Sequence, residues 1–239
     1  MTTWLFDLGN TRLKYAPLLA DGSLGRVQAC AHDDAGTWLA ALPEGDVACI
    51  ASVASETRRV ALLDALSSRF IRLHRVHTEA ALGPLQIAYP IPAHLGVDRF
   101  LAMLGACTGT AALVVGVGTA LTIDIVDAHG VHHGGRIAPS PQLMREALHA
   151  RAAQLPASGG IYTEFADDTS PALAAGCEGA ALALIERSLH MAASQLNTAP
   201  RLYLHGGGAQ ALRVHLPAHV WAADAVLLGL ARWHALRIA

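Results

Sequence analysis

The sequence predicts an α/β protein made of two similar lobes, each with a mixed β-sheet and flanking helices. Short apolar runs of strand length alternate with longer segments of helical periodicity, glycine-containing turns join the first strands, and this pattern recurs in the second half of the chain. Of the 239 residues, 53% are hydrophobic and 15% are charged, so the chain can bury a sizeable core. Only 5% are aromatic, and the large share of alanine favours closely packed helices.

The first half of the chain begins with three predicted strands joined by two tight turns. Gly9-Asn10 and Asp21-Gly22 mark these turns, because such residues readily adopt the backbone angles that tight turns require. A proline-rich loop at 89–92 later precedes a helix that begins near Gly96. The expected strands are 4–6, 13–19, 25–31 and 47–53, and the expected helices before the loop are 37–42 and 56–69.

The second half repeats the strand and turn pattern of the first. Thr11 and Thr119 are 108 positions apart (119 − 11), as are Gly22 and Gly130 (130 − 22), with one extra residue between Gly9 and Thr11. A chance match is the alternative to a true repeat. We place the lobes at 1–109 and 110–239. The expected strands of the second lobe are 113–117, 121–126, 131–137 and 202–205, and its expected helices are 142–151, 172–196 and a last one from 222.

Charge and hydropathy exclude several classes of partner. Lys and Arg total 17 against 19 Asp and Glu, so no basic surface for nucleic acid is expected. Asp7 interrupts the first hydrophobic run, which is atypical of a signal segment. The longest apolar stretch, 111–126, is too short and too polar to span a membrane. We expect a cytoplasmic protein with neither a membrane nor a nucleic acid as partner.

Cysteine and histidine spacing does not indicate a metal site. The cysteines lie far apart without a C-x-x-C pair, at positions Cys30, Cys49, Cys107 and Cys177. Free thiols are therefore expected rather than a zinc site. Three histidines, His129, His132 and His133, fall in the turn-like segment DAHGVHHGG. A solvated hairpin is the expectation there, because no further ligands are positioned to complete a metal's coordination sphere.

Two turns have the composition of phosphate-binding loops. A turn of Gly9, Asn10 and Thr11 exposes backbone N–H groups and a hydroxyl, which can hold phosphate oxygens. Asp7, just before it, can hold Mg²⁺ directly or through water. Gly118-Thr119 repeats the turn in the second lobe, so two such turns could grip a nucleotide from both sides of a cleft. Ordinary hairpin turns are the alternative for either one alone; their matched register favours phosphate binding.

A third glycine loop, Gly206-Gly207-Gly208, follows the predicted strand at 202–204 and opens a helix at Ala209. In the actin and sugar-kinase superfold, a late glycine pair of this kind lets the backbone approach adenosine. The segment does not contain the G-x-G-x-x-G of dinucleotide-binding folds, and the sequence has no P-loop motif.

The combined motifs resemble those of type III pantothenate kinases over nearly the whole chain. They are D-L-G-N-T at 7–11, L-G-V-D-R at 95–99, G-T-A-L-T-I-D at 118–124, G-G-R-I-A-P at 134–139, D-T-S-P-A-L at 168–173 and the glycines at 206–208. The resemblance implies two ribonuclease-H-like lobes, each with a five-stranded mixed sheet, and a cleft between them. It also implies ATP-dependent phosphorylation of pantothenate to 4′-phosphopantothenate, the first step of coenzyme A biosynthesis.

The same resemblance implies a role for each matching residue. Asp98 is the catalytic base that activates the pantothenate hydroxyl, Asp7 carries Mg²⁺, and Asp124 holds a monovalent cation, K⁺ or NH₄⁺. The implied ATP-binding residues are Asp7, Gly9, Asn10, Thr11, Lys14, Gly118, Thr119, Gly206 and Gly207. The implied pantothenate-binding residues are Tyr89, Gly96, Val97, Arg99 and Thr169. Thr169 is implied to act from the neighbouring subunit of a homodimer. For Lys14, an exposed strand lysine is an equal alternative to a phosphate contact.

Several positions depart from the family pattern, and other functions stay open. Val97 replaces the usual alanine, Asp168 stands where asparagine is common, and Pro141 follows Ser140 where Pro-Gly is frequent. The dipeptide at 98–99, taken alone, fits a helix cap with a surface ion pair better than a catalytic site; only the surrounding motifs reverse this. A non-catalytic accessory or regulatory protein of the same superfold is one alternative function. A kinase of another small hydroxy acid or of a sugar is the other.

Overall fold

The computed structural model describes residues 1–32 and 37–238, which form two compact units. The first unit contains Met1–Cys107 together with the segment from Asp224, and the second is Thr108–Ala223. This differs from the division at 109/110 that the sequence analysis drew, because the last helix belongs to the first unit. Each unit is built around one five-stranded sheet.

The first unit has a mixed sheet in the order β3-β2-β1-β4-β5. β1, β2 and β3 are antiparallel neighbours, whereas β1, β4 and β5 run parallel. The strands are β1 (Thr3–Leu8), β2 (Arg12–Leu18), β3 (Gln28–Ala31), β4 (Gly45–Ser52) and β5 (Phe70–Arg75). A short ribbon of β6 (Ala81–Leu82) and β7 (Leu85–Gln86) follows.

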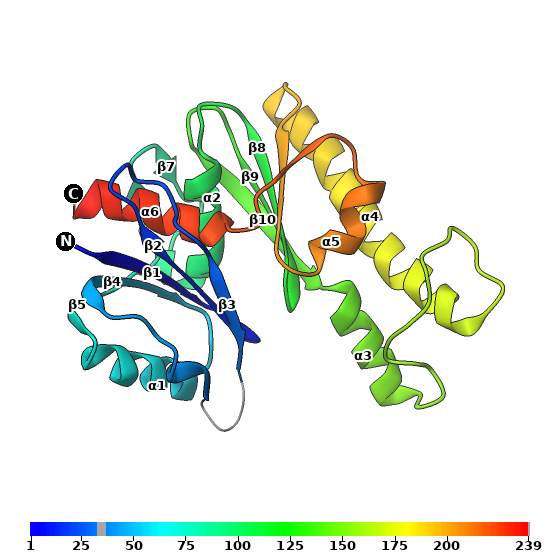
Figure 1. Ribbon diagram of the computed structural model, residues 1–239. Helices are drawn as coiled ribbons and strands as arrows, with labels where there is room; N and C mark the ends of the chain where they lie inside the picture. The colour runs from blue at the N-terminus through cyan, green and yellow to red at the C-terminus, as the bar shows by residue number, and fades with distance from the viewer. Residues whose placement is uncertain (33–36, 239) are drawn as a thin grey trace. The chain divides into compact units, whose positions relative to one another are not determined.

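Helices lie on both faces of this sheet, with α1 on one side and α6 on the other (Figure 1). The helices are α1 (Glu56–Ser67), α2 (Val97–Ala106) and α6 (Ala225–Arg237), with 3₁₀ turns η1 (Thr37–Leu39) and η2 (Pro92–His94). Leu62 and Leu66 of α1 pack with Phe6 and Ile50. Because alternate strand residues face opposite sides, Leu5 and Asp7 face the side of α2 and α6.

The crossing of α2 and α6 explains why the last helix belongs to the first unit. A Cβ at Gly229 of α6 would lie 2.1 Å from the Leu101 carbonyl oxygen of α2, so only glycine allows this approach. Arg232 of α6 also donates hydrogen bonds to the carbonyls of Leu104 and Cys107, at 2.8 and 2.6 Å. Both contacts join residues more than a hundred positions apart, which local sequence patterns do not reveal.

The second unit repeats the sheet of the first, in the order β10-β9-β8-β11-β12. Its strands are β8 (Ala112–Val117), β9 (Ala120–Val126), β10 (His132–Pro139), β11 (Arg201–His205) and β12 (His219–Trp221). Its helices are α3 (Pro141–Arg151), α4 (Thr169–Leu196) and α5 (Ala209–Leu212), followed by η3 (Arg213–His215). Ile185 of α4 packs with Val115 and Ile123 in the core. The matching order and strand directions confirm the predicted repeat.

Most predicted elements are present, and the differences are local. The expected helix at 37–42 is only the 3₁₀ turn η1, and the last helix starts at Ala225 rather than 222. The short edge strands β5 and β12 were not predicted; β5 carries basic residues that interrupt apolar alternation. All four cysteines are free, as expected. Across the described ranges, no helix combines the length and apolar character that a membrane span requires.

Candidate active site

The turn between β1 and β2 has the geometry of a tight loop at the carboxyl end of a parallel strand. Gly9 N donates to the Arg12 carbonyl oxygen over 3.1 Å and closes the turn. Asn10 and Thr11 are exposed at its tip. Ligands of open α/β sheets bind at the carboxyl ends of parallel strands. The first predicted phosphate-binding turn therefore lies where such sheets hold their ligands.

Asp7 and Lys14 lie opposite each other on β1 and β2. Lys14 Nζ is 3.2 Å from Asp224 Oδ1, just before α6. Loss of hydration raises the pKa of Asp7 to about 7; the charges of Asp98 and Asp224 add to the rise, and Lys14 opposes it. The first unit thus brings together three carboxylates and one ammonium group.

Asp98 occupies the first turn of α2, where Gly96 is the N-cap residue. Its Oδ1 accepts a hydrogen bond from Arg99 N at 2.9 Å, so it interacts with the positive end of the helix. A Cβ at Gly96 would lie 2.6 Å from Asp98 Oδ1, and glycine there leaves room for the carboxylate. The Val97 side chain is buried, as a packing role for this position would require.

Arg99 and Tyr89, both predicted to bind pantothenate, are in contact. Arg99 Nη1 lies 3.2 Å from the Tyr89 hydroxyl, and the guanidinium carbon is 5.7 Å from the centre of the Tyr89 ring. The Arg99 side chain is only 6% exposed. The alternative of a surface ion pair at 98–99 therefore does not describe Arg99, which is a buried cation.

In the second unit, the glycine loop packs against the end of β8. A Cβ at Gly206, whose φ is +91°, would lie 2.4 Å from the Val117 carbonyl oxygen, and Gly208 N donates to that oxygen over 3.0 Å. The turn at Gly118-Thr119 follows directly and is closed by a 2.9 Å hydrogen bond from Gly118 N to Ala120 O. The second turn predicted to bind phosphate and the glycine loop are therefore neighbours.

Asp124 of β9 has a partner that the sequence analysis missed. Its Oδ1 lies 3.1 Å from His132 Nε2 on β10, and both side chains are almost fully buried. The resemblance implies a monovalent cation at Asp124, and the sequence predicts a solvated hairpin around His132. The available signal was strand register: the β9–β10 hairpin pairs Val126 with His132, which brings the two strands into side-chain reach.

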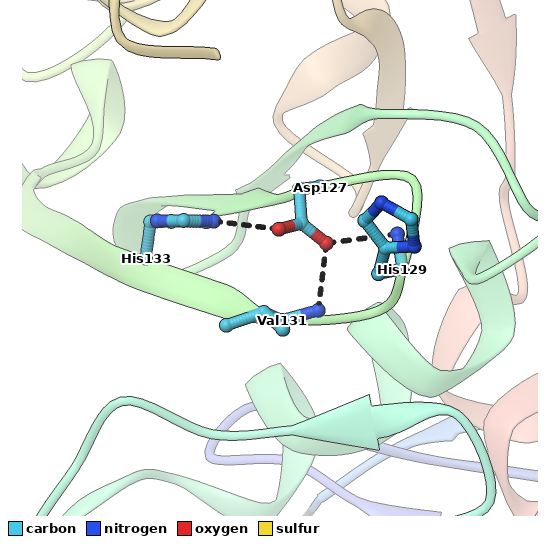
Figure 2. A network of polar contacts seen from close by, with 4 residues as sticks. All are labelled: Asp127, His129, Val131 and His133. Carbon is cyan, nitrogen blue, oxygen red and sulfur yellow. Dashed lines mark hydrogen bonds and ion pairs between the residues drawn. The ribbon is translucent and has the colours of Figure 1, made fainter.

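The other two histidines of this segment, His129 in the hairpin turn and His133 in β10, contact Asp127, which is the centre of a polar network (Figure 2). Asp127 Oδ1 accepts hydrogen bonds from the backbone N–H groups of His129 and Val131, and Oδ2 lies 2.9 Å from His133 Nε2. Burial opposes ionisation, but the bonds from His133, Val131 and His129 outweigh it and lower the pKa of Asp127. Among the residues described, no three His, Cys, Asp or Glu side chains are grouped to hold a metal ion.

Thr169 is the first residue of α4 in the second unit, and it is exposed. Asp168 is the N-cap residue, but its side chain makes no capping hydrogen bond. Two further residues of the first unit had no motif to reveal them. Asp224 lies beside Lys14, and Ser52 ends β4 with a buried hydroxyl for which the described residues provide no hydrogen-bond partner.

Solved structures define the class of fold. A protein from Campylobacter jejuni, described as a Baf family transcriptional activator, is similar with a TM-score of 0.65 and 21% identity over 97% of both chains. A protein from Sinorhizobium meliloti, described as a 2-dehydro-3-deoxygalactonokinase, is similar with a TM-score of 0.56 and 13% identity over 99% of this chain and 100% of the other. The protein therefore has the actin-like ATPase and sugar-kinase fold, as predicted.

Sequence comparisons identify the family within that class. The family model for type III pantothenate kinase matches residues 4–191. A type III pantothenate kinase of Stenotrophomonas maltophilia strain R551-3 is 56% identical over 237 residues, which cover 98% of this chain and 97% of the relative. One from Xanthomonas campestris strain B100 is also 56% identical, over 239 residues, with the same coverage. This chain belongs to the type III pantothenate kinase family.

Proposed function

We propose that this protein transfers the γ-phosphoryl group of ATP to the hydroxyl of pantothenate, giving 4′-phosphopantothenate and ADP in the first step of coenzyme A biosynthesis. One observation carries the proposal beyond family membership. In the first unit, Asp98 is close enough to Asp7 to raise its pKa, and it is adjacent in sequence to the buried Arg99, which contacts the half-buried Tyr89. A base, a metal-binding acid and a carboxylate-binding cation are the groups that this reaction needs.

The charges around Asp7 favour a divalent cation there. Asp98 and Asp224 repel the carboxylate of Asp7, and Lys14 offsets only part of this repulsion. Mg²⁺ prefers such oxygen ligands, and it is usually held by one or two carboxylates together with water and substrate phosphates. We assign Asp7 to Mg²⁺, directly or through water. When bound with ATP, the ion neutralises charge on the phosphate oxygens.

Asp98 is assigned as the general base. It accepts the proton of the pantothenate hydroxyl while the hydroxyl oxygen forms a bond to the γ-phosphorus and the bond to the β-phosphate oxygen breaks. The buried Arg99 guanidinium provides charged hydrogen bonds to the pantothenate carboxylate, and the Tyr89 hydroxyl holds the guanidinium in place. Gly96 and Val97, which precede Asp98 and Arg99, are assigned to the pantothenate site through their backbone.

We assign the glycine turns to the nucleotide. In the first unit these are Gly9, Asn10 and Thr11, with Lys14 as a phosphate contact; its ion pair with Asp224 favours this role over a free surface lysine. In the second unit Gly118 and Thr119 are assigned to phosphate, and Gly206 and Gly207 to the adenosine. Gly206 packs so closely on Val117 that no side chain would fit there, which agrees with a loop whose backbone approaches its ligand.

The resemblance assigned K⁺ or NH₄⁺ to Asp124, and we keep this cation as part of the proposal. The buried His132 ring nitrogen lies 3.1 Å from the carboxylate. A neutral histidine donates a hydrogen bond through Nε2 but leaves the negative charge of the buried carboxylate, which a monovalent cation would neutralise. We derive no step of the reaction through this cation.

We also propose a homodimer in the cytoplasm, in which Thr169 completes the pantothenate site of the neighbouring subunit. Ile161 and Phe165, shortly before Thr169, are 82% and 98% exposed, which is unusual for large apolar side chains in a monomer. Light scattering at several protein concentrations tests the dimer. An active monomer would remove Thr169 from the site.

A turnover assay tests the proposed function. Purified protein with ATP, Mg²⁺ and pantothenate should release ADP in equal amount to phosphopantothenate identified by mass. A parallel panel of small hydroxy acids and sugars tests the alternative substrates. Nucleotide binding without turnover of any of these would favour a non-catalytic accessory role instead.

A further inference from the structure

The carbonyl oxygens of the first phosphate turn are held by groups from outside the turn. The Gly9 oxygen lies 3.0 Å from His32 Nε2, and the Asn10 oxygen accepts a 2.7 Å hydrogen bond from Arg58 Nη1. The Thr11 oxygen accepts a 3.2 Å bond from the backbone N–H of His32. Three successive carbonyls are thus bound by two residues, one after β3 and the other in α1.

These bonds fix the direction of the turn's N–H groups. In a planar trans peptide, the carbonyl and the N–H of the next residue point in opposite directions. The carbonyls of Gly9 and Asn10 point toward His32 and Arg58, so the N–H groups of Asn10 and Thr11 point away from them. Successive N–H groups on one side of a turn form a concave site for anions.

We propose that Arg58 and His32 are positioning residues of the kinase, which orient the Asn10 and Thr11 N–H groups toward the phosphates of ATP. This inference rests on the proposed nucleotide-binding function of the turn. Neither residue belongs to a motif that identified the family.

Arg58 is well placed for this role because its own position is fixed. It is the third residue of α1, and its backbone N–H donates to the capping hydroxyl of Ser55. Its neighbour Arg59 points elsewhere and forms a 3.9 Å ion pair with the exposed Glu56. The guanidinium of Arg58 also places a positive charge beside the turn, which favours an anion there.

His32 is held equally firmly. Its ring packs edge-on against the buried Trp38, with 4.9 Å between ring centres. A carbonyl oxygen only accepts hydrogen bonds, so Nε2 must carry the proton that reaches Gly9. The same residue binds Thr11 through its backbone, and so it ties both ends of the turn to β3.

Arg58→Ala and the matched control Arg59→Ala test the proposal by direct titration with MgATP and with adenosine. Arg58→Ala removes one charged hydrogen bond to the turn and should weaken MgATP binding about tenfold or more. Adenosine lacks the phosphates, and its affinity should stay within about twofold. Arg59→Ala should change neither. In turnover, Arg58→Ala should raise KM for ATP and leave KM for pantothenate unchanged.

Two conservative variants keep the test decisive if the alanine variant is unstable. Arg58→Gln and His32→Gln each retain an N–H donor, and each should keep more MgATP affinity than the alanine variant at the same position. Equal MgATP affinity in Arg58→Ala and Arg59→Ala, or parallel losses for MgATP and adenosine, would overturn the proposal. If the parent binds MgATP but does not phosphorylate pantothenate, the proposed function fails while this titration still decides the role of Arg58.

Discussion

Lys14 Nζ lies 3.2 Å from Asp224 Oδ1, although the two residues are 210 positions apart in the chain. Their side chains are only 24% and 30% exposed, so the ion pair is partly shielded from water. Lys14 is the direct cross-strand neighbour of Asp7. Asp224 therefore fixes an ammonium group beside the acid that we assign to Mg²⁺.

Asp224→Asn should raise KM for ATP severalfold, because Lys14 loses the partner that fixes its position. The cost in stability should be small, about 1 kcal/mol or less, as for other partly exposed ion pairs. Steady-state kinetics and thermal unfolding check both expectations. Glu56→Gln, which removes the acid of the exposed pair with Arg59, is the control. Identical ATP kinetics in the two variants would show that Asp224 has no part in nucleotide binding.

Asp98→Asn should lower kcat by about two to four orders of magnitude, the usual effect of losing a general base. Asparagine keeps the shape of the side chain and can still accept the hydrogen bond from Arg99 N. Pantothenate binding, measured by calorimetry, should therefore survive. A change in kcat of less than roughly tenfold would exclude Asp98 as the base.

Arg99→Ala should act chiefly on KM for pantothenate, because the guanidinium is assigned to the substrate carboxylate. The buried side chain also fills space, so Tyr89→Phe provides a milder test that removes only the hydroxyl bound to Arg99. We expect a large rise in KM for Arg99→Ala and a rise of a few fold for Tyr89→Phe. An unchanged KM in both would place the carboxylate elsewhere.

Asp7→Asn should abolish activity yet stabilise the metal-free protein at high pH. The folded-state pKa of about 7 lies above the ordinary 3.8, so the folded state holds a proton that the unfolded state releases between these values. The preference of the folded state for the protonated carboxyl stabilises the protein below about pH 4, and this contribution to the free energy of unfolding is lost as the pH rises through 7. Asparagine does not ionise, so the variant keeps its stability over this range. Its Tm should exceed that of the parent at pH 8 but not near pH 4.

Asp21→Asn is a control, because the pKa of Asp21 is shifted in the opposite direction to that of Asp7. Hydrogen bonds from the Ser23 hydroxyl and the Ser23 backbone N–H lower it. The stability that Asp21 contributes is present above the ordinary pKa and lost on acidification. Its variant should have a Tm at or below that of the parent at pH 8. Scans in chelator without nucleotide at pH 4.5 and pH 8 make the comparison. The same Tm difference for Asp7→Asn at both pH values would contradict the cause given for its shift.

Turnover should depend on K⁺ or NH₄⁺ and be weak in Na⁺, because a hydrogen bond from a neutral His132 does not neutralise the buried Asp124 carboxylate. Rates in KCl, NH₄Cl and NaCl at matched ionic strength measure this dependence. Asp124→Asn should lose it. Equal rates for the parent in KCl and NaCl would leave Asp124 with a structural role.

The sequence alone determined the two sheets and the turns that we predict to bind phosphate, because the interactions that specify them are local. Alternating apolar residues define the strands, and turns such as Gly9-Asn10-Thr11 and Gly118-Thr119 depend on backbone angles that few residues adopt. The matched spacing of these turns in the two halves predicted the repeat, which appears in the strand order that both sheets have. The motif combination around Asp98 and Arg99 indicated the family before the fold was known.

Only the tertiary structure determined the partners of the charged groups. Lys14 meets Asp224 because glycine at 229 lets α6 cross closely over α2, a contact between distant segments. His132 reaches Asp124 because the hairpin register turns its side chain inward rather than toward solvent. Arg58 reaches the turn at Asn10 from a helix that lies far from it in the sequence. Such side-chain contacts depend on how whole elements pack, and no periodicity within one segment encodes them.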